Sequence, residues 1–245
     1  MGISVVFPAY NEEMNIRPTI ERALAAMRSL GQEFEIIIVD DASTDSTGSI
    51  ADQFAAATTE VRVLHNQKNV GQGASIVQAF RHARHQLLTH NAMDYSFDLL
   101  DLSKMLPLLA EADIVVATRT ARAGYSRYRV LTSVVHKALL HLLFPLRLRD
   151  YNFTQLYTRS VWDAIKVEAR STAFLTPEAL IRAHDMGYRI KEVDIEYHAR
   201  VAGVATSGRP KVILHSLRDM FVFWWKRLLG RTPRRRPNNT ESRGT

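Results

Sequence analysis

The sequence predicts an α/β protein in which a mostly parallel sheet is covered by helices on both faces. Short apolar runs alternate with segments of helical periodicity through the first half of the chain. The runs at 3–7 and 34–39 have the continuous apolar pattern of strands that are buried on both faces. With 245 residues, of which 46% are hydrophobic, the chain has the size and composition of one compact domain.

The predicted elements alternate regularly as far as residue 117. Apolar residues recur at helical spacing in 12–30, between the first two strands, and again in the segment that ends near residue 57. After these, we expect a strand at 61–64, a helix at 74–88, a second helix at 100–109 and a strand at 113–117. In a sheet of this kind, the ligand binds at the carboxyl ends of the strands.

The second half of the chain is less regular. The pattern predicts an amphipathic segment at 130–144, helices at 161–167 and 177–185, a strand at 188–195 and an aromatic-rich helix at 212–229. From residue 230 onward, Pro, Arg, Asn and Gly predict disorder. We therefore expect a main domain at 1–208, a C-terminal amphipathic helix at 209–229 and a basic disordered tail at 230–245.

The charge distribution and the lack of cysteine exclude several classes of protein. Most of the net charge of +7 lies in the last twenty residues, in a tail and not on a folded face. This placement argues against a nucleic-acid partner and favours an anionic membrane surface, contacted through 212–236. Disulfides and thiolate metal sites are excluded because the chain has no cysteine. Without a long apolar segment or a basic leader, we expect a cytoplasmic protein that is peripheral on the membrane.

Polar residues follow the first two predicted strands, at 8–13 and at 40–45. Their carboxylates are suited to accept bonds from base N–H groups and ribose hydroxyls, and Tyr10 offers a stacking face. The alternative is that Asn11 and the residues at 43–45 only cap the helices that follow. The occurrence of two such clusters at successive strand ends favours a ligand site.

These motifs resemble the family 2 glycosyltransferases, which have the GT-A fold. The resemblance is carried by Val-Val-Phe-Pro-Ala-Tyr-Asn-Glu-Glu, then Ile-Ile-Ile-Val-Asp-Asp-Ala-Ser-Thr-Asp-Ser-Thr, then Asn-Val-Gly-Gln-Gly at 69–73. The segments at 115–119, 149–153 and 177–200 are similar to the polyprenol-phosphate (dolichol-phosphate) mannosyl- and glucosyltransferases. A dinucleotide fingerprint at 71–76 is the weaker interpretation, because Ile76 replaces its third glycine.

The resemblance implies a nucleotide-sugar site with assigned residues. It places the nucleoside against Pro8, Tyr10, Glu12, Val39 and Asp41, and the phosphates against Arg119, Arg200 and the nearby Arg129. Guanidinium groups suit this task because they bind phosphate oxygens through forked, charge-assisted hydrogen bonds.

The metal motif of the family, Asp-x-Asp followed by Gln, corresponds here to 92–96 and is incomplete. Ala92 replaces the first aspartate and Ser96 the glutamine, so Asp94 is the expected ligand of a Mg or Mn ion. Asn91 and Asp98 are the candidates to assist it, and the alternative is that Asp94 only begins a turn. A second departure is Thr206, which replaces a phosphate-binding lysine of the family, although Arg209 and Lys211 follow.

The implied reaction is an inverting transfer of sugar from a nucleotide-sugar of the GDP-mannose or UDP-glucose type to a polyprenyl phosphate. The acceptor phosphate is ionised near neutral pH, so no strong base is needed, and a metal ion at Asp94 together with Arg119 and Arg200 would stabilise the departing diphosphate. Asp150 is expected to orient the acceptor or to form a structural ion pair. A transferase with a non-lipid acceptor and a non-catalytic nucleotide-sugar-binding relative remain the alternatives.

Overall fold

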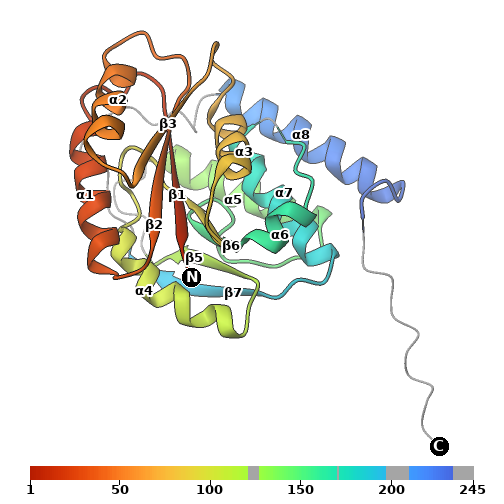
Figure 1. The fold of residues 1–245 in the computed structure, drawn as a ribbon. Coiled ribbons are helices and arrows are strands. Elements are labelled where there is room, and N and C mark those ends of the chain that lie inside the picture. The colour runs from red at the N-terminus through yellow and green to blue at the C-terminus, as the bar shows by residue number, and fades with distance from the viewer. Residues whose placement is uncertain (121–126, 170, 197–209, 234–245) are drawn as a thin grey trace, which may run out of the picture.

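A single seven-stranded sheet, with strand order β3-β2-β1-β4-β6-β5-β7, forms the centre of the molecule (Figure 1). The structure is a computed structural model that describes residues 1–245 except 121–126, 170, 197–209 and 234–245. The strands are β1 (Ile3–Ala9), β2 (Phe34–Asp40), β3 (Val61–His65), β4 (Leu87–His90), β5 (Ile114–Arg119), β6 (Gln155–Thr158) and β7 (Ile190–Ile195). The predicted α/β class with a mostly parallel sheet is confirmed.

The direction of the strands brings the ends of β1, β2 and β4 to one edge of the sheet. β1 pairs in parallel with β2 on one side and with β4 on the other. β6 runs antiparallel to both β4 and β5, and β5 therefore runs parallel to β4. The residues that follow β1, β2, β4 and β5 consequently lie at the same edge, where ligands bind in sheets of this kind.

Helices cover both faces of the sheet and form two hydrophobic cores (Figure 1). One face packs against α1 (Ile16–Ser29), α2 (Thr47–Ala57), α4 (Leu102–Met105) and the flanking 3₁₀ turns η1 (Leu99–Asp101) and η2 (Leu106–Ala110). The other face packs against α3 (Gln72–His82), α5 (Arg127–Leu143), α6 (Arg159–Ala164), α7 (Thr172–Asp185) and α8 (Pro210–Leu228). Alternate residues of each strand supply the two cores, because successive side chains point to opposite faces.

Two strands, β4 and β6, were not predicted from the sequence pattern. The predicted helix at 74–88 ends at His82, because Ala83 takes up an extended conformation with φ −65° and ψ 147°. The chain then enters β4, which lies in the middle of the sheet between β1 and β6. Each of the two strands has four residues, too few for a strand pattern to be distinguished from the end of a helix.

The predicted helix at 100–109 is instead a short α-helix between two 3₁₀ turns. Pro107 lies near the start of η2, where its missing N–H group interrupts the helical hydrogen bonds. The predicted helix at 177–185 is longer than expected, since α7 begins at Thr172 and contains Pro177. The aromatic-rich helix predicted at 212–229 is α8, which packs against α7 and joins the hydrophobic core of that face through Met220 and Phe223. Among the helices of the described residues, none has the length and apolar character needed to cross a membrane.

Candidate functional site

The backbone is strained at three strand ends along the same edge of the sheet. Asn11 follows β1, Ala42 follows β2 and Tyr95 lies in the turn after β4, and each has a positive φ, of 54°, 60° and 49° respectively. They are the three non-glycine residues with positive φ among the described residues. Because this conformation costs free energy for residues with a Cβ atom, its repetition at one edge indicates a functional site.

The loops after β1 and β2 are hydrogen-bonded to each other. The Asn11 N–H donates to Ser43 Oγ at 3.0 Å, and the Thr44 N–H donates to Asn11 Oδ1 at 2.8 Å. The Glu12 N–H donates to Thr47 Oγ1 at 2.8 Å. The N-caps of α1 and α2 are other residues, Asn15 and Ser46. Asn11 and Ser43 therefore join two loops and do not cap the helices that follow them.

The residues expected at the nucleoside lie on these loops and on the strands that precede them. Pro8 and Val39 are neighbours in the β1–β2 register, and both residues are buried. A ligand can therefore contact them only where their strands reach the edge of the sheet. Tyr10 is 46% exposed and is available for stacking. The Glu12 carboxylate accepts a hydrogen bond from Asn15 Nδ2 at 2.7 Å and is half-buried.

Asp41, at the end of β2, is a buried carboxylate that accepts three hydrogen bonds from the segment before α3. Asn66 Nδ2 and the Val70 N–H donate to its Oδ1 at 2.8 and 2.9 Å, and the Gly71 N–H donates to its Oδ2 at 2.8 Å. Gly71 has a φ of 88°, which explains why glycine occupies this turn. Asp41 thus fixes the 66–71 segment against the loop where the nucleoside is expected.

Replacing Asp41 with Asn is expected to lower the free energy of unfolding by about 1–3 kcal/mol. The amide nitrogen of the new side chain cannot accept a hydrogen bond, so either Gly71 or the Asn66–Val70 pair loses its acceptor. Urea unfolding of the two proteins measures the difference. As a control, Asp163→Asn alters an exposed carboxylate on α6, and an equal loss in both variants would contradict the role given to Asp41.

Asp94 lies in a tight turn after β4, close to the other strand ends. Its Oδ1 accepts a hydrogen bond from the Ser96 N–H at 3.2 Å, and the residue is half-buried. The Asn91 side chain is buried and bonds to Phe97 O and to the Ala92 N–H within the turn. Asp98 pairs with Arg22 at 2.6 Å. Neither Asn91 nor Asp98 is therefore arranged to assist Asp94 as a metal ligand.

A divalent cation with few protein ligands fits this donor set. The described residues contain no group of three or more His, Cys, Asp or Glu side chains placed to hold a metal ion. Magnesium is commonly held by one or two carboxylates together with phosphate oxygens and water. A site with Asp94 as its carboxylate ligand suits a cation that binds together with a diphosphate. It does not suit a cation whose ligands all come from the protein.

Arg119 and Asp150 form a buried ion pair with each other. Arg119 Nε donates to Asp150 Oδ2 at 2.6 Å and Nη2 donates to Oδ1 at 2.8 Å, with side-chain exposures of 10% and 5%. The Asn152 N–H also donates to Asp150, at 3.1 Å. The neighbouring Arg149 pairs with Glu192 and Asp194 instead. This geometry favours the ion-pair interpretation of Asp150, with Arg119 as its partner.

The Arg119–Asp150 pair lies beside the turn that carries Asp94. The Arg119 guanidinium lies over the Phe153 ring, 5.2 Å from its centroid. The Phe153 ring in turn contacts the Phe97 ring edge-on, with centroids 5.8 Å apart, and Phe97 O accepts the Asn91 side chain. The structure therefore brings Asp41, Asp94, Arg119 and Asp150 to one edge of the sheet.

The remaining predicted arginines cannot be placed. Arg129 belongs to α5, but its side chain lies outside the described residues, and Arg200 lies outside them entirely. The same holds for Thr206 and Arg209, and for the side chain of Lys211. Their phosphate-binding roles stay predictions.

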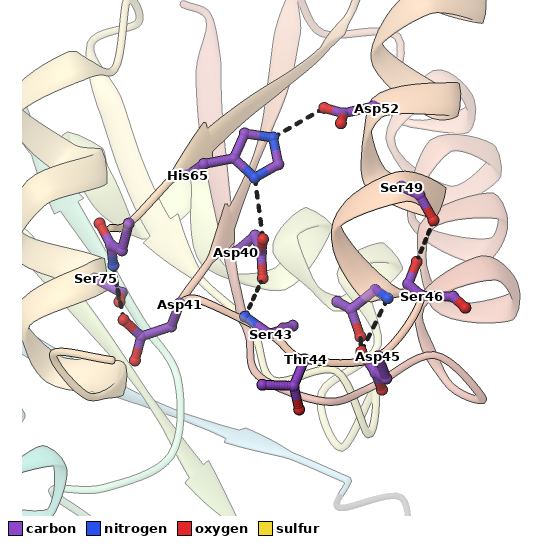
Figure 2. Close-up of polar contacts among 12 residues, drawn as sticks. Asp40, Asp41, Ser43, Thr44, Asp45, Ser46, Ser49, Asp52, His65 and Ser75 are labelled. Carbon is purple, nitrogen blue, oxygen red and sulfur yellow. Dashed lines mark hydrogen bonds and ion pairs between the residues drawn. The ribbon is translucent and has the colours of Figure 1, made fainter. Parts of the chain in front are cut away.

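Sequence reasoning did not single out His65, which lies among the residues behind the strand ends. Its Nδ1 lies 3.0 Å from Asp40 Oδ2 and its Nε2 lies 2.9 Å from Asp52 Oδ1 (Figure 2). Asp40 also accepts the Ser43 N–H at 3.0 Å. Nothing in the spacing of 40, 52 and 65 indicates this contact, because three separate elements bring the side chains together.

Comparison with known proteins identifies the family. The model of the family described as "Glycosyl transferase family 2" matches residues 4–172, which is more than half of the chain. The chain belongs to glycosyl transferase family 2. The match covers β1 to β6 and so includes Asp41, Asp94, Arg119 and Asp150.

Relatives with assigned names are similar along most of this chain. The dodecaprenyl-phosphate galacturonate synthase of Rhizobium johnstonii is 30% identical over 92% of this chain and 68% of its own length. The undecaprenyl-phosphate 4-deoxy-4-formamido-L-arabinose transferase of Photorhabdus laumondii is 29% identical, over 86% of this chain and 64% of its own. The glycosyltransferase AglD of Haloferax volcanii is 27% identical over 91% of this chain. The chain spans 37% of AglD, so this relative is much longer.

Solved structures of two proteins share the fold. Glucosyl-3-phosphoglycerate synthase from Mycobacterium tuberculosis, solved with Mn2+, UDP and glucosyl-3-phosphoglycerate, superposes with a TM-score of 0.68 at 17% identity. The superposition covers 90% of this chain and 78% of that chain. TarS from S. aureus superposes with a TM-score of 0.57 at 18% identity, over 91% of this chain and 72% of the TarS chain. These likenesses confirm the GT-A fold expected for this family 2 chain.

Proposed function

We propose that this family 2 chain transfers a sugar, with inversion, from a nucleotide-sugar to a polyprenyl phosphate at a membrane surface. The observation that carries the proposal is the meeting of Asp41, Asp94 and the Arg119–Asp150 pair at the strand ends, where the backbone is strained at three residues. The names of the relatives support the acceptor class, since two of them are polyprenyl-phosphate sugar transferases.

The donor is proposed to bind along the loops after β1 and β2. The nucleoside would lie against the Pro8 and Val39 backbone edge, with Tyr10, Glu12 and Asp41 around it. The diphosphate would lie toward Asp94, which would hold a Mg or Mn ion together with the phosphate oxygens. Arg119, Arg129 and Arg200 are the cations proposed to balance the remaining charge. A donor of the GDP-mannose or UDP-glucose type is compatible with these contacts.

The chemistry places modest demands on the protein side chains. An oxygen of the acceptor phosphate forms a bond to the anomeric carbon as the bond from that carbon to the diphosphate oxygen breaks, and the nucleoside diphosphate departs. A phosphate monoester is mostly ionised near pH 7, because its second pKa is about 6. The protein therefore needs no strong general base, and its main contribution is to stabilise negative charge on the leaving diphosphate. A bound divalent cation would supply further positive charge there.

Transfer of labelled sugar tests the proposal directly. Purified protein is incubated with undecaprenyl phosphate, Mn2+ and radiolabelled GDP-mannose, UDP-glucose or UDP-galacturonate, and the lipid is extracted into chloroform. A chloroform-soluble, mild-acid-labile product from any donor supports the function. Transfer only to soluble saccharides would instead support the non-lipid acceptor, and nucleotide binding without any transfer would support a non-catalytic binder.

Exposed apolar side chains on α8 and α5 support the proposed membrane contact. On α8, the side chains that face away from the core include Leu214, Phe221 and Trp225, with exposures of 67%, 47% and 58%. On α5, Leu131 and Leu142 are 61% and 78% exposed, and the helix has no acidic residue. A helix with an exposed apolar face and basic neighbours suits the interface of an anionic bilayer.

Replacing Phe221 and Trp225 with Glu is expected to reduce binding to liposomes of anionic lipid by at least about tenfold. The substitution removes two exposed aromatic side chains and adds two negative charges to the same face. Co-sedimentation with liposomes measures the bound fraction. A matched control, Gln53→Glu with Leu100→Glu, adds the same charge at exposed positions on the opposite face of the sheet. Equal retention of both variants would contradict the proposed contact.

A further inference from the structure

The strand-end loops are supported from behind by a chain of polar contacts centred on His65. His65 is the last residue of β3, and its ring lies between Asp40, the last residue of β2, and Asp52 on α2 (Figure 2). The distances are 3.0 Å from Nδ1 to Asp40 Oδ2 and 2.9 Å from Nε2 to Asp52 Oδ1. Side-chain exposure falls from 61% at Asp52 to 46% at His65 and 9% at Asp40. The ring therefore connects solvent to a buried carboxylate.

The two carboxylates favour the protonated form of the ring. A neutral imidazole has one N–H donor, so it can donate to only one of two carboxylates, whereas the imidazolium can donate to both. The bond to Asp52 raises the pKa of His65, burial opposes this effect, and the bond to Asp40 raises the pKa further. Burial raises the pKa of Asp40, but hydrogen bonds from Ser43 and His65 outweigh it and hold this pKa below its ordinary value. The two charged groups described in contact with His65 are Asp40 from β2 and Asp52 from α2.

The contacts of Asp40 continue into the candidate donor site. Asp40 Oδ1 accepts the Ser43 N–H at 3.0 Å, and Ser43 Oγ accepts the Asn11 N–H at 3.0 Å. Between Asp40 and Ser43 lie Asp41, with its three hydrogen bonds, and Ala42, with its strained φ of 60°. A carboxylate held at both oxygens keeps this turn in one conformation although the backbone at Ala42 disfavours it.

The close approach of α2 to this cluster depends on a glycine. A Cβ atom at Gly48 would lie 2.8 Å from Asp40 Oδ2 and 3.6 Å from His65 Cε1. A side chain at this position would require the Asp40 carboxylate to shift from its contact with the ring. The arrangement is therefore built into the packing of β2, β3 and α2.

We propose that His65 is a positioning residue: held between Asp40 and Asp52, its imidazolium keeps the loop after β2 in the conformation that binds a nucleoside diphosphate. The proposal rests on the proposed function for the identity of the ligand. His65 lies behind the loop and acts through Asp40 and Ser43. It follows that the loop is held most firmly while Asp40 is ionised and His65 is protonated, and that it loosens as pH rises through the folded-state pKa of His65.

Hydrogen exchange of the ligand-free protein tests the positioning directly. At pH 6, His65→Gln is expected to speed exchange of the Ser43 and Thr44 amides by about tenfold, which corresponds to the loss of one ordinary hydrogen bond. His82→Gln, a substitution of the same kind at an exposed position on α3, serves as the control and should match the wild type. As pH rises and the ring becomes neutral, it can donate to only one of the two carboxylates, so the difference between the wild type and His65→Gln should become smaller. Exchange in His65→Gln that equals the wild type at pH 6 overturns the proposal.

Calorimetric titration with GDP and UDP tests the consequence for binding. At pH 6 the His65→Gln variant is expected to bind the nucleotides more weakly than the wild type. Between pH 6 and pH 9 the affinity of both proteins falls, and the fall in the wild type is expected to be larger by a factor of at least about three. Ionisation of the nucleotide changes the affinity of both proteins equally, so it does not contribute to the difference between them. Asp52→Asn removes one of the two carboxylates that favour the imidazolium, so the fall should move to lower pH. Parallel pH profiles for the wild type and His65→Gln overturn the proposal.

Failure of the proposed function gives a different pattern of results. If the wild type binds neither nucleotide at any pH, the nucleotide-sugar function fails and the ligand assigned to the loop fails with it. The exchange experiment uses no ligand, so fast exchange in His65→Gln would still establish that His65 positions the loop.

Discussion

Replacing Asp94 with Ala is expected to lower sugar transfer by about two orders of magnitude or more, while the melting temperature stays within about 3 °C. Asp94 is the carboxylate proposed to hold the divalent cation at the departing diphosphate, and the turn supplies no second carboxylate in a suitable position, because Asp98 pairs with Arg22. Loss of charge stabilisation at the leaving group raises the barrier directly. The stability cost is expected to be small, because the residue is half-buried and the hydrogen bond that its carboxylate accepts from the Ser96 N–H is long, at 3.2 Å.

Asp98→Ala is the matched control for this experiment. It removes a carboxylate four residues away that bonds to Arg22 and to the Leu100 N–H, and it should leave most of the transfer activity intact. Initial rates at saturating donor, with Mn2+ varied, compare the two variants. Turnover in Asp94→Ala equal to that of the wild type would refute the assigned role.

Replacing Asp150 with Ala is expected to lower the free energy of unfolding by about 3–5 kcal/mol. The substitution leaves the Arg119 guanidinium, whose side chain is 10% exposed, without the carboxylate that accepts two of its hydrogen bonds. For comparison, Glu60→Ala breaks the pair with Arg28, whose side chain is 56% exposed, and should cost less than about 1 kcal/mol. Equal losses in urea unfolding would contradict the structural importance of the buried pair.

A double variant separates the two interpretations of Asp150. Arg119→Met with Asp150→Leu replaces the ion pair by apolar side chains of similar size and should recover most of the lost stability. If Asp150 serves only to hold Arg119, the double variant should have the same residual transfer activity as Arg119→Met alone. If Asp150 also orients the acceptor, the double variant should be further impaired, mainly in the KM for the lipid phosphate.

Much of the fold follows from local sequence pattern. The seven-residue strands β1 and β2 are mostly apolar because they are buried on both faces, and each is followed by a helix with a regular apolar face. β4 and β6 escaped prediction because their four residues become strands by pairing in the middle of the sheet. The segment at 100–109 has the apolar content of a helix, but Pro107 breaks the helical hydrogen bonds within it.

The candidate site was predictable in its location and only partly in its contacts. Polar clusters at the ends of β1 and β2 indicate the edge of the sheet that carries the site, and the family motif leads to Asp94. The bonds from Asn66, Val70 and Gly71 to Asp41 and the pairing of Arg119 with Asp150 join segments about 25–31 residues apart. No local pattern contains such contacts, since they depend on how β2, β3, β5 and the adjoining loops come together.

Binding of a nucleoside diphosphate measures the central claim most directly, because the account requires a diphosphate to lie at the strand ends beside Asp94. Melting temperatures are recorded for the wild type and for Asp94→Ala with GDP or UDP, with and without Mn2+. A nucleotide at about a hundredfold excess over its Kd should raise the wild-type melting temperature by about 5 °C or more. Mn2+ should increase this shift in the wild type and leave it unchanged in Asp94→Ala. A wild-type melting temperature that neither nucleotide alters, with Mn2+ present, would contradict the account.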